Sequence, residues 1–258
     1  MSSATPGSSD RRTRQRLWSE VLIVLGLSLG ASAVYSIVII IDRTTQTTAL
    51  SEQTATIVKT LSDRQIFDLI YQFLAIFFGL MPVALVAFIL WQTARPHLTK
   101  LGIDFHHPAK DALSALALVL IVGIPGIGLY VLGRTLGMNV AVDPDNLPQY
   151  WWAIPILILR AILAGVTEEV IVIGYLFSRL TTLGYNRWTI ILGAALLRGT
   201  YHLYQGFGGF IGNMAMGILF GWLYTRSGRL LPLVIAHTLI DVAVFVGYPW
   251  AATTFTWL

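Results

Sequence analysis

Long, uninterrupted blocks of apolar residues are the feature that most constrains this chain. At a rise of about 1.5 Å per residue, a helix of about 20 apolar residues crosses the hydrocarbon core of a bilayer. Hydrophobic residues make up 55% of the chain and charged residues only 12%, which is about half the charged share of a soluble domain. This balance excludes an ordinary soluble enzyme, a disordered chain and a coiled coil. The sequence predicts an all-α, polytopic membrane helical bundle.

Polar or basic segments separate the apolar blocks, and each block is predicted to be one transmembrane helix. The seven blocks are Leu17–Ile41, Ile66–Gln92, Asp111–Leu136, Tyr150–Arg179, Trp188–Tyr204, Phe210–Tyr224 and Leu230–Gly247. The fourth block is longer than one straight crossing needs, so we expect it to tilt or kink. Pro82 is expected to kink the second block. The glycines of segment 123–128 are expected to bend the third or to let neighbouring helices approach closely.

The blocks divide the chain into four parts. Residues 1–16 are expected to be a disordered cytoplasmic tail, and residues 17–149 to hold the first three transmembrane helices with their loops. Residues 150–248 form a core of transmembrane helices 4–7, and residues 249–258 a short C-terminal tail. Segment 137–149 is predicted to be a loop, and Leu50–Leu61 either a short interfacial helix or an ordered loop. Paired tryptophans at Trp151 and Trp152, and Trp188, are predicted to anchor at the membrane interface.

The first block admits two interpretations. A basic stretch precedes it and Ala31-Ser32-Ala33 resembles the cleavage site of a secretory signal. The apolar run continues to Ile41, however, where a mature secreted protein would usually turn polar. We therefore expect an uncleaved membrane anchor.

Basic residues predict the orientation of the bundle. With the N-terminus inside, eleven Lys and Arg residues fall on inner segments and four on or near outer ones. This asymmetry places the N-terminus in the cytoplasm and the C-terminus outside. The basic residues are spread over loops rather than clustered on one element, so nucleic acid is not an expected partner. The chain has no cysteine, which excludes disulfides, thiolate metal sites and a cysteine nucleophile.

Ionisable residues gather in the apolar blocks of the C-terminal half. Each charged residue at the middle of a bilayer costs about 2.5–3.5 kcal/mol, so these side chains are expected to pair or to line a wet cavity. Such a cluster indicates a functional site. Its members are Arg160, Glu168, Glu169, Arg198, His202, His237 and Asp241.

Spacing places several of these residues on shared helix faces. His237 and Asp241 are four residues apart, as are Arg198 and His202. The adjacent Glu168 and Glu169 point about 100° apart on a helix, so one can face a reacting centre while the other meets a supporting partner. A carboxylate with two imidazoles can activate water, either as an acid–base pair or as metal ligands.

Three motifs in this half resemble those of the CPBP (CAAX protease and bacteriocin-processing) family of intramembrane proteases, which includes the type II CAAX prenyl endopeptidases. The family patterns are EExxxR, FxxxH and HxxxN or HxxxD on successive helices. Here they correspond to Glu168-Glu169, to Arg198-Gly199-Thr200-Tyr201-His202 and to His237-Thr238-Leu239-Ile240-Asp241. Gly174-Tyr175-Leu176 and Leu231-Pro232 agree as well. The resemblance covers roughly residues 150–245 and implies a CPBP-like catalytic core.

The resemblance implies a role for each motif residue. Glu168 corresponds to the general base that activates the attacking water together with His202. His237 and Asp241 correspond to the pair that positions the scissile carbonyl and stabilises its oxyanion. Glu169 corresponds to the supporting glutamate.

Two positions depart from the family pattern. Ile173 replaces the arginine that ends the first motif, and Arg198 replaces the aromatic residue that opens the second. We predict that Arg198 compensates by pairing with Glu169 from the neighbouring helix. Asn213 is a further supporting candidate, facing either the cavity or a neighbouring helix. Arg160 has no counterpart in the family and is expected to be a structural partner or to extend toward the interface.

The chemistry implied by the resemblance leaves the metal open. Glu168, His202 and His237 are the three residues that could hold a divalent metal such as zinc; the family's reaction is also described without one. His97, His106 and His107 lie in a loop and are not expected to bind metal. The expected substrate is a membrane protein or a lipidated or hydrophobic peptide, and the expected location is the lipid bilayer of a bacterial cell.

Two other functions use the same residues. A non-catalytic member of the family could serve in immunity or as a scaffold, with the motif residues holding helices together. A proton-coupled transporter also uses buried acids and histidines, although the sequence lacks the internal repeats common in transporters.

Overall fold

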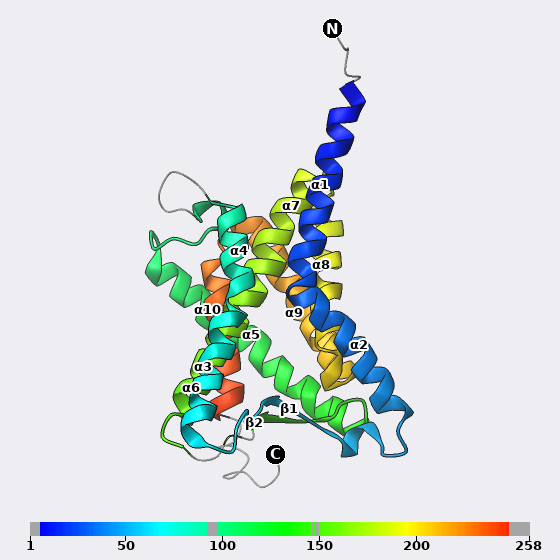
Figure 1. Ribbon diagram of the computed structural model, residues 1–258, viewed down its shortest axis with the longest axis vertical. Helices are drawn as coiled ribbons and strands as arrows, with labels where there is room; N and C mark the ends of the chain where they lie inside the picture. Colours follow the sequence, from blue (N-terminus) through cyan, green and yellow to red (C-terminus); the bar gives the residue numbers. More distant parts are fainter. Residues whose placement is uncertain (1–5, 92–97, 146, 148–149, 248–258) are drawn as a thin grey trace.

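The structure is a computed structural model that describes residues 6–91, 98–145, 147 and 150–247. It is a helical membrane bundle, as the sequence predicted, with most helices running along its long axis and a small sheet at one end (Figure 1). The start of α1 and the sheet lie at opposite ends of the bundle (Figure 1). The helical elements are α1 (Pro6–Gly26), α2 (Leu29–Thr45), η1 (Leu50–Glu52), α3 (Gln65–Gly79), α4 (Met81–Ile89), η2 (Thr99–Leu101), α5 (Pro108–Thr135), α6 (Ala153–Glu168), η3 (Glu169–Tyr175), α7 (Leu176–Thr182), α8 (Arg187–Tyr201), η4 (Leu203–Gln205), α9 (Phe207–Ser227), α10 (Leu231–Val242) and η5 (Ala243–Gly247).

Each predicted apolar block coincides with one helical segment, although several segments consist of more than one helix. By length and hydropathy alone, three helices in the described part of the chain are suited to cross a membrane: Gln65–Ile89, Pro108–Thr135 and Phe207–Ser227. The bent pair α1–α2 adds a fourth. The remaining segments fall short because they are brief or carry the ionisable cluster: α8 has 15 residues, which is about 22 Å of helix.

The N-terminal segment corrects the prediction of a disordered tail over residues 1–16. Residues 6–16 form the first half of α1, because the four arginines and Gln15 of this stretch are good helix formers and the helix continues into the apolar block. Residues 1–5 lie outside the described part. The first block is then bent by 57° between Gly26 and Leu29, where the Ser28 hydroxyl donates to the Val24 carbonyl (2.6 Å).

A two-stranded parallel sheet is the one departure from an all-α fold in the described residues. Strand β1 (Thr54–Val58) pairs with β2 (Ala141–Asp145) in the register Thr54↔Ala141. Neither alternative for Leu50–Leu61 anticipated a strand, and the loop predicted at 137–149 contains β2. The Thr- and Val-rich composition of β1 favours extended backbone, and the partner strand lies 87 residues away in sequence, where no local pattern reveals it.

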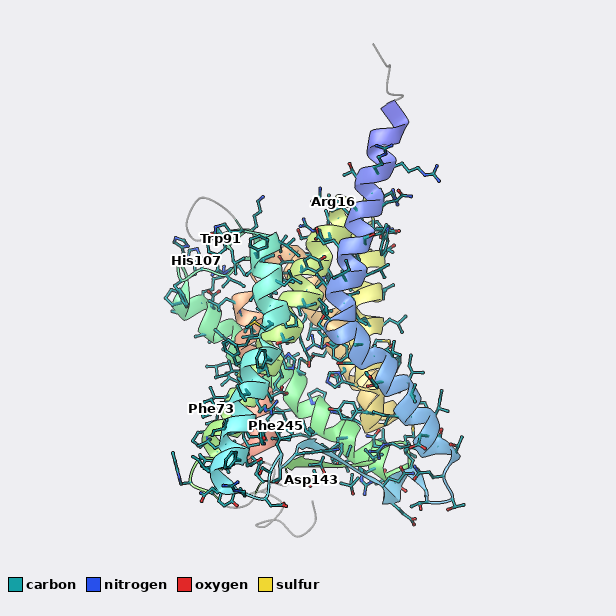
Figure 2. All side chains as sticks on the ribbon, in the orientation of Figure 1. Arg16, Phe73, Trp91, His107, Asp143 and Phe245 are labelled. Carbon is teal, nitrogen blue, oxygen red and sulfur yellow. The ribbon has the colours of Figure 1, made fainter. Side chains whose placement is uncertain are left out.

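Apolar side chains cover much of the outer surface, as expected for a bundle surrounded by lipid. Phe73 of α3 and Trp91 after α4 point outward (Figure 2) and are 51% and 57% exposed. Val38 of α2 and Ile124 of α5 are similarly exposed. A soluble protein would bury most of these side chains, so their position supports a membrane environment.

The most buried element is η3, a π-helical segment at the centre of the bundle. Its residues from Val170 to Ile173 and Tyr175 are 0–3% exposed and belong to the main apolar core. Glu20 of α1 accepts hydrogen bonds from Tyr175 (3.0 Å) and Arg179 (2.6 Å). The first helix is thereby tied to the segment that carries the paired glutamates.

An ion-pair cluster fixes the start of α10. Arg229 donates to Asp111 (2.6 Å) and to Asp104 (3.1 Å). The hydrogen bond from Arg229 lowers the pKa of Asp104 well below its usual range. This contribution to stability is therefore present above the ordinary aspartate pKa and is lost only as pH falls through the lower folded value.

Several local expectations need correction or qualification. Trp152 is 2% exposed and packs with Ile76 and Ile156 rather than anchoring at the interface, whereas Trp151 is 80% exposed. The glycines at 123, 126 and 128 have open space where a side chain would begin, so they do not bring helices together. The break expected at Pro82 is present between α3 and α4.

Candidate active site

The paired glutamates lie where the fourth block changes from α-helix to π-helix. Glu168 is the last residue of α6 and Glu169 the first of η3. A π-helical turn contains an extra residue, which rotates the following side chains relative to an α-helix, and such turns are frequent at functional sites. Glu168 is 9% exposed and Glu169 is fully buried. The change of helix type therefore gives two neighbouring carboxylates different surroundings.

Arg198 of α8 forms the ion pair with Glu169 that the sequence predicted. Its Nη2 donates to Glu169 Oε1 at 2.7 Å and lies 3.5 Å from Glu168 Oε2. Ile173, which stands in place of the motif arginine, is fully buried in the apolar core. Two buried opposite charges thus neutralise each other across two helices, while the usual arginine position is filled by hydrocarbon.

Gly217 of α9 makes room for this arginine. A side chain there would begin 3.2 Å from Arg198 Cδ and 2.9 Å from the Cα of Ala195. The Arg198 guanidinium also lies over the ring of Phe220, 5.5 Å from its centre. Small and aromatic residues of α9 therefore hold the long side chain toward the glutamates.

His237 of α10 connects the two carboxylates. Its Nδ1 is 2.8 Å from Glu169 Oε1 and 3.0 Å from Arg198 Nη2. A carboxylate only accepts and a guanidinium only donates, so Nδ1 either donates to Glu169 or accepts from Arg198; we assign Nδ1–H to Glu169, which is the shorter contact. Nε2 then faces Asp241 Oδ2 at 3.6 Å and Glu168 Oε2 at 3.9 Å. The predicted pair His237 and Asp241 therefore lies beside the predicted base.

Tyr201 is a member of the cluster that sequence reasoning missed. Its hydroxyl donates to Glu168 Oε2 at 2.8 Å, and its side chain is 4% exposed. The available signal was its position three residues after Arg198, which places both side chains on the same face of α8. This bond fixes one oxygen of Glu168.

His202 caps the end of α8 next to Tyr201. Its Nδ1 lies 3.0 Å from the Arg198 carbonyl, which only accepts, so Nδ1 carries the proton and Nε2 is the free acceptor of the neutral ring. The rings of Tyr201 and His202 are 4.7 Å apart between centres. Ser36 of α2 donates to the Tyr201 carbonyl (2.9 Å) and so supports this helix end.

A close approach of α6 and α10 brings the first and third motifs together. A side chain at Gly165 would begin 3.0 Å from the backbone nitrogen of Thr238 and 3.2 Å from the Val234 carbonyl oxygen. Gly165 is one turn before Glu169, and Thr238 follows His237. The absence of a side chain at Gly165 therefore allows the carboxylates to reach the histidine.

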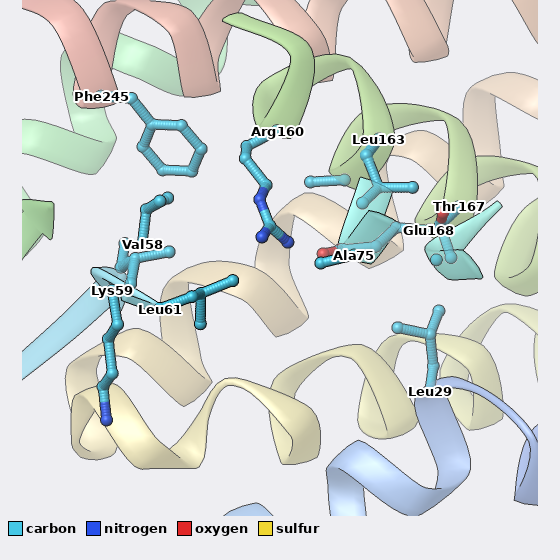
Figure 3. Close-up of a pocket in the computed structure, with 13 residues that line it drawn as sticks. Leu29, Val58, Lys59, Leu61, Ala75, Arg160, Leu163, Thr167, Glu168 and Phe245 are labelled. Atoms are coloured by element: carbon cyan, nitrogen blue, oxygen red, sulfur yellow. The ribbon is translucent and has the colours of Figure 1, made fainter. Parts of the chain in front are cut away.

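A cavity of about 540 Å³ opens beside the cluster (Figure 3). Glu168 and Thr167 line it from α6, Phe245 from η5 and Leu29 from α2. The sequence predicts that Glu168, His202, His237 and Asp241 line one cavity, but only Glu168 is among the residues that line this one. His237 lies between Glu168 and Asp241, and His202 packs against Tyr201, which donates to Glu168.

The side-chain arrangement does not fit a metal at Glu168, His202 and His237. Within the described ranges, no three His, Cys, Asp or Glu side chains are grouped so that they could hold a metal ion. Glu168 Oε2 already accepts from Tyr201 and lies 3.5 Å from the Arg198 cation, which would repel a second cation. The cluster is instead an acid–base and hydrogen-bond network.

Other candidates lie away from the cluster. Asn213 donates to the Gly209 carbonyl within its own helix (3.0 Å) and not to a site carboxylate. His106 pairs with Asp104 (2.9 Å) at the surface, and His107 is exposed. His97 lies outside the described residues.

Comparison with known protein families gives a match over the segment that contains this site. Residues 150–243 match the family described as type II CAAX prenyl endopeptidase Rce1-like. No curated protein and no solved structure matches the chain. The matched segment contains every residue of the cluster, and the match supports a relationship of this part of the chain to the type II CAAX prenyl endopeptidases.

Proposed function

We propose that the protein is an intramembrane endopeptidase that hydrolyses a peptide bond with water activated by Glu168 and His202. The observation that carries this proposal is the buried network in which Glu168, Tyr201 and Arg198 meet beside a cavity. A carboxylate base held in a membrane bundle is expensive to maintain. Its placement at a cavity wall supports a reaction on a molecule that enters there.

The first step is removal of a proton from water. Tyr201 occupies Oε2 of Glu168, so Oε1 is assigned to the attacking water. His202 presents a free Nε2, because its Nδ1–H is committed to a backbone carbonyl. It can accept a proton from the water and later donate it to the leaving amine. The hydroxyl of Tyr201 keeps the base in one orientation during both transfers.

The second requirement is stabilisation of the oxyanion that forms on the scissile carbonyl. His237 is assigned this role with Asp241, whose carboxylate lies 3.6 Å from Nε2. With Nδ1–H donated to Glu169, the form of His237 that acts here is the doubly protonated ring, whose Nε2–H points away from that carboxylate and can be donated to the oxyanion. The Glu169–Arg198 pair is a support that fixes the His237 ring. No step requires a metal.

The expected substrate is a hydrophobic or lipidated segment within the bilayer. Leu29, Leu163 and Phe245 give the cavity beside Glu168 an apolar wall, which suits an extended apolar peptide. A bacterial cell membrane and a cytoplasmic N-terminus, as expected from the sequence, complete the proposal.

A second candidate function is a non-catalytic scaffold. The observation that favours it is that the same hydrogen bonds join η3, α8 and α10, which a purely structural network would also do. The two functions differ in their dependence on a basic carboxylate. A structural network needs the hydrogen bond at Glu168, whereas hydrolysis needs its charge.

Glu168→Gln separates the two functions, because glutamine still accepts from Tyr201 but cannot act as the base. The two chains are expressed in cells, and new peptide termini in the membrane proteome are compared. Loss of the base alone should reduce cleavage by about 10²–10⁴-fold, while Glu52→Gln, an exposed carboxylate, should leave it unchanged. Identical product profiles for wild type and Glu168→Gln would support the scaffold. Activity should also survive a chelator; loss in chelator with recovery in zinc would contradict the metal-free mechanism.

A further inference from the structure

The cavity beside Glu168 holds a second polar feature that the proposed reaction does not use. Arg160 of α6 reaches into it, between Phe245 on one side and Glu168 on the other (Figure 3). We propose that Arg160, held in place by Gln72, binds a carboxylate of the peptide substrate at a distance from the bond that is cleaved. The inference rests on the proposed function, because it assigns a specificity site to the same cavity.

Arg160 has no acidic partner among the described residues. No carboxylate lies within 4.0 Å of its guanidinium, and its hydrogen bond within the protein goes to the neutral amide oxygen of Gln72 (2.7 Å). Its Nε is buried without a partner. An arginine in the middle of a membrane helix is costly unless it is paired. An arginine in an apolar cavity, paired only with an amide, is suited to bind an anion that arrives with a ligand.

Gln72 fixes the position of the Arg160 side chain but, as a neutral amide, does not neutralise its charge. The Gln72 side chain is fully buried on α3, and its Nε2 donates to the Lys59 carbonyl at 2.9 Å. This bond fixes the orientation of the amide, so Oε1 must face Arg160. One edge of the guanidinium is thereby anchored, and the remaining N–H groups are left for a ligand.

Asp68 is a buried acidic residue of α3, one turn before Gln72. It is fully buried, and its Oδ1 accepts from the backbone nitrogens of Leu61 (2.6 Å) and Ser62 (3.2 Å). Asp68 therefore holds the backbone of residues 61–62 against the first turns of α3, and its carboxylate does not lie within 4.0 Å of the Arg160 guanidinium. The alternative explanation is that the charge of Asp68 stabilises Arg160 as a structural partner.

Helix geometry sets the spacing between the anion and the reaction. Arg160 and Glu168 are eight residues apart on α6, or about 12 Å along the axis. An extended peptide advances about 3.3 Å per residue, so about four residues span this distance. Between the two charges the wall is apolar, with Leu163 and Ala164. The structure thus favours a substrate with an apolar segment of about four residues between the cleaved bond and a carboxylate.

Binding by the inactive Glu168→Gln protein tests this subsite without turnover. The full chain is placed in discs of neutral phosphatidylcholine and titrated with a fluorescent, N-acetylated hexapeptide of Ala, Leu and Val. The peptide is used as a free acid, as a C-terminal amide, and as an amide with one internal Glu. We expect the free acid or the internal-Glu form to bind about tenfold more tightly than the plain amide, the effect of one charge-assisted hydrogen bond. The stronger of the two identifies the source of the carboxylate.

Substitution of Arg160 in the same background must remove this preference. Arg160→Gln should bind all three peptides equally, and Arg160→Lys should keep part of the preference because it retains the charge. Arg187→Gln, an exposed arginine at the start of α8, serves as the matched control and should keep all of it. Thermal unfolding of each variant shows whether it is folded. If Arg160→Gln does not fold, the preference for a carboxylate is compared in Arg160→Lys and Gln72→Met instead.

Several results would overturn the proposal. One is that all three peptides bind equally to Glu168→Gln, or that none binds detectably. Another is that Arg160→Gln keeps the preference for the peptides that carry a carboxylate. Equal losses of stability in Arg160→Gln and Asp68→Asn with unchanged binding would assign Arg160 to a structural pair. Loss of the preference in discs of anionic phosphatidylglycerol would assign it to a lipid headgroup. Carboxylate-dependent binding without cleavage by the wild type would contradict the proposed hydrolysis but leave the subsite intact.

Discussion

Arg198 donates to Glu169 at 2.7 Å from a neighbouring helix, while position 173, where the family motif has an arginine, holds a fully buried isoleucine. The cation that pairs with Glu169 therefore comes from α8 and not from η3, the element that carries Glu169 and position 173. The consequence is that α8 and η3 are joined by a charge pair, whereas an arginine at position 173 would pair within its own helix.

Removal of this cation should destabilise the protein strongly. Arg198→Met leaves Glu169 buried without a counter-charge, which typically costs about 3–5 kcal/mol. Thermal unfolding in detergent should therefore show a large drop in midpoint temperature. Arg187→Gln at the exposed start of α8 is the control and should change little. A midpoint for Arg198→Met close to that of the wild type would show that the pair does not support the fold.

Tyr201→Phe should affect the reaction more than the fold. It removes the hydroxyl that holds Oε2 of Glu168, a bond to a charged group worth about 1.5–3 kcal/mol. Tyr204→Phe also loses a hydrogen bond, from Gln205 (2.9 Å), but not one to the site. We expect a fall in cleavage of about tenfold or more for Tyr201→Phe alone, measured by the appearance of new peptide termini. Equal effects of the two variants would remove Tyr201 from the site.

Gly165→Ala should separate α6 from α10. The added carbon meets the backbone at Thr238 and Val234, and overpacking of this kind costs about 1–3 kcal/mol. Gly193 of α8 has open space at the corresponding position, so Gly193→Ala should be neutral. Comparison of their unfolding midpoints isolates the close approach from the general effect of replacing glycine in a helix. Indistinguishable midpoints would mean that the two helices adjust without loss.

The charge asymmetry predicts the topology of the bundle. Reporter domains inserted at Gly228 should report the cytoplasm and those at Gly137 the outside, because the basic residues follow the positive-inside rule. Both glycines lie in turns with positive φ, at 65° and 70°, where an insertion disturbs little regular structure. If Gly228 reports the outside and Gly137 the cytoplasm, the bundle has the opposite orientation. If both reporters give the same side, the two turns do not lie on opposite sides of the membrane.

The amino-acid sequence by itself determined the membrane class, the position of the apolar blocks and the residues of the cluster other than Tyr201. These features are local: a block of apolar residues specifies a membrane helix wherever it lies, and i, i+4 spacing places His237 and Asp241 on one face. The pairing of Arg198 with Glu169 could also be predicted from the sequence. A buried charge requires a partner of opposite sign, and the apolar blocks of the C-terminal half contain few acidic residues.

The tertiary structure decided what depends on contacts between distant segments. The pairing of β1 with β2, the bond from Tyr201 to Glu168 and the contact of Gln72 with Arg160 join residues 33 or more positions apart, and no periodicity encodes them. The tertiary structure also bears on whether Glu168, His202 and His237 can hold a metal, because it places the Arg198 cation 3.5 Å from Glu168 Oε2. The helical start at Pro6 was missed because a polar, basic stretch becomes helical when it extends an apolar helix that is already formed.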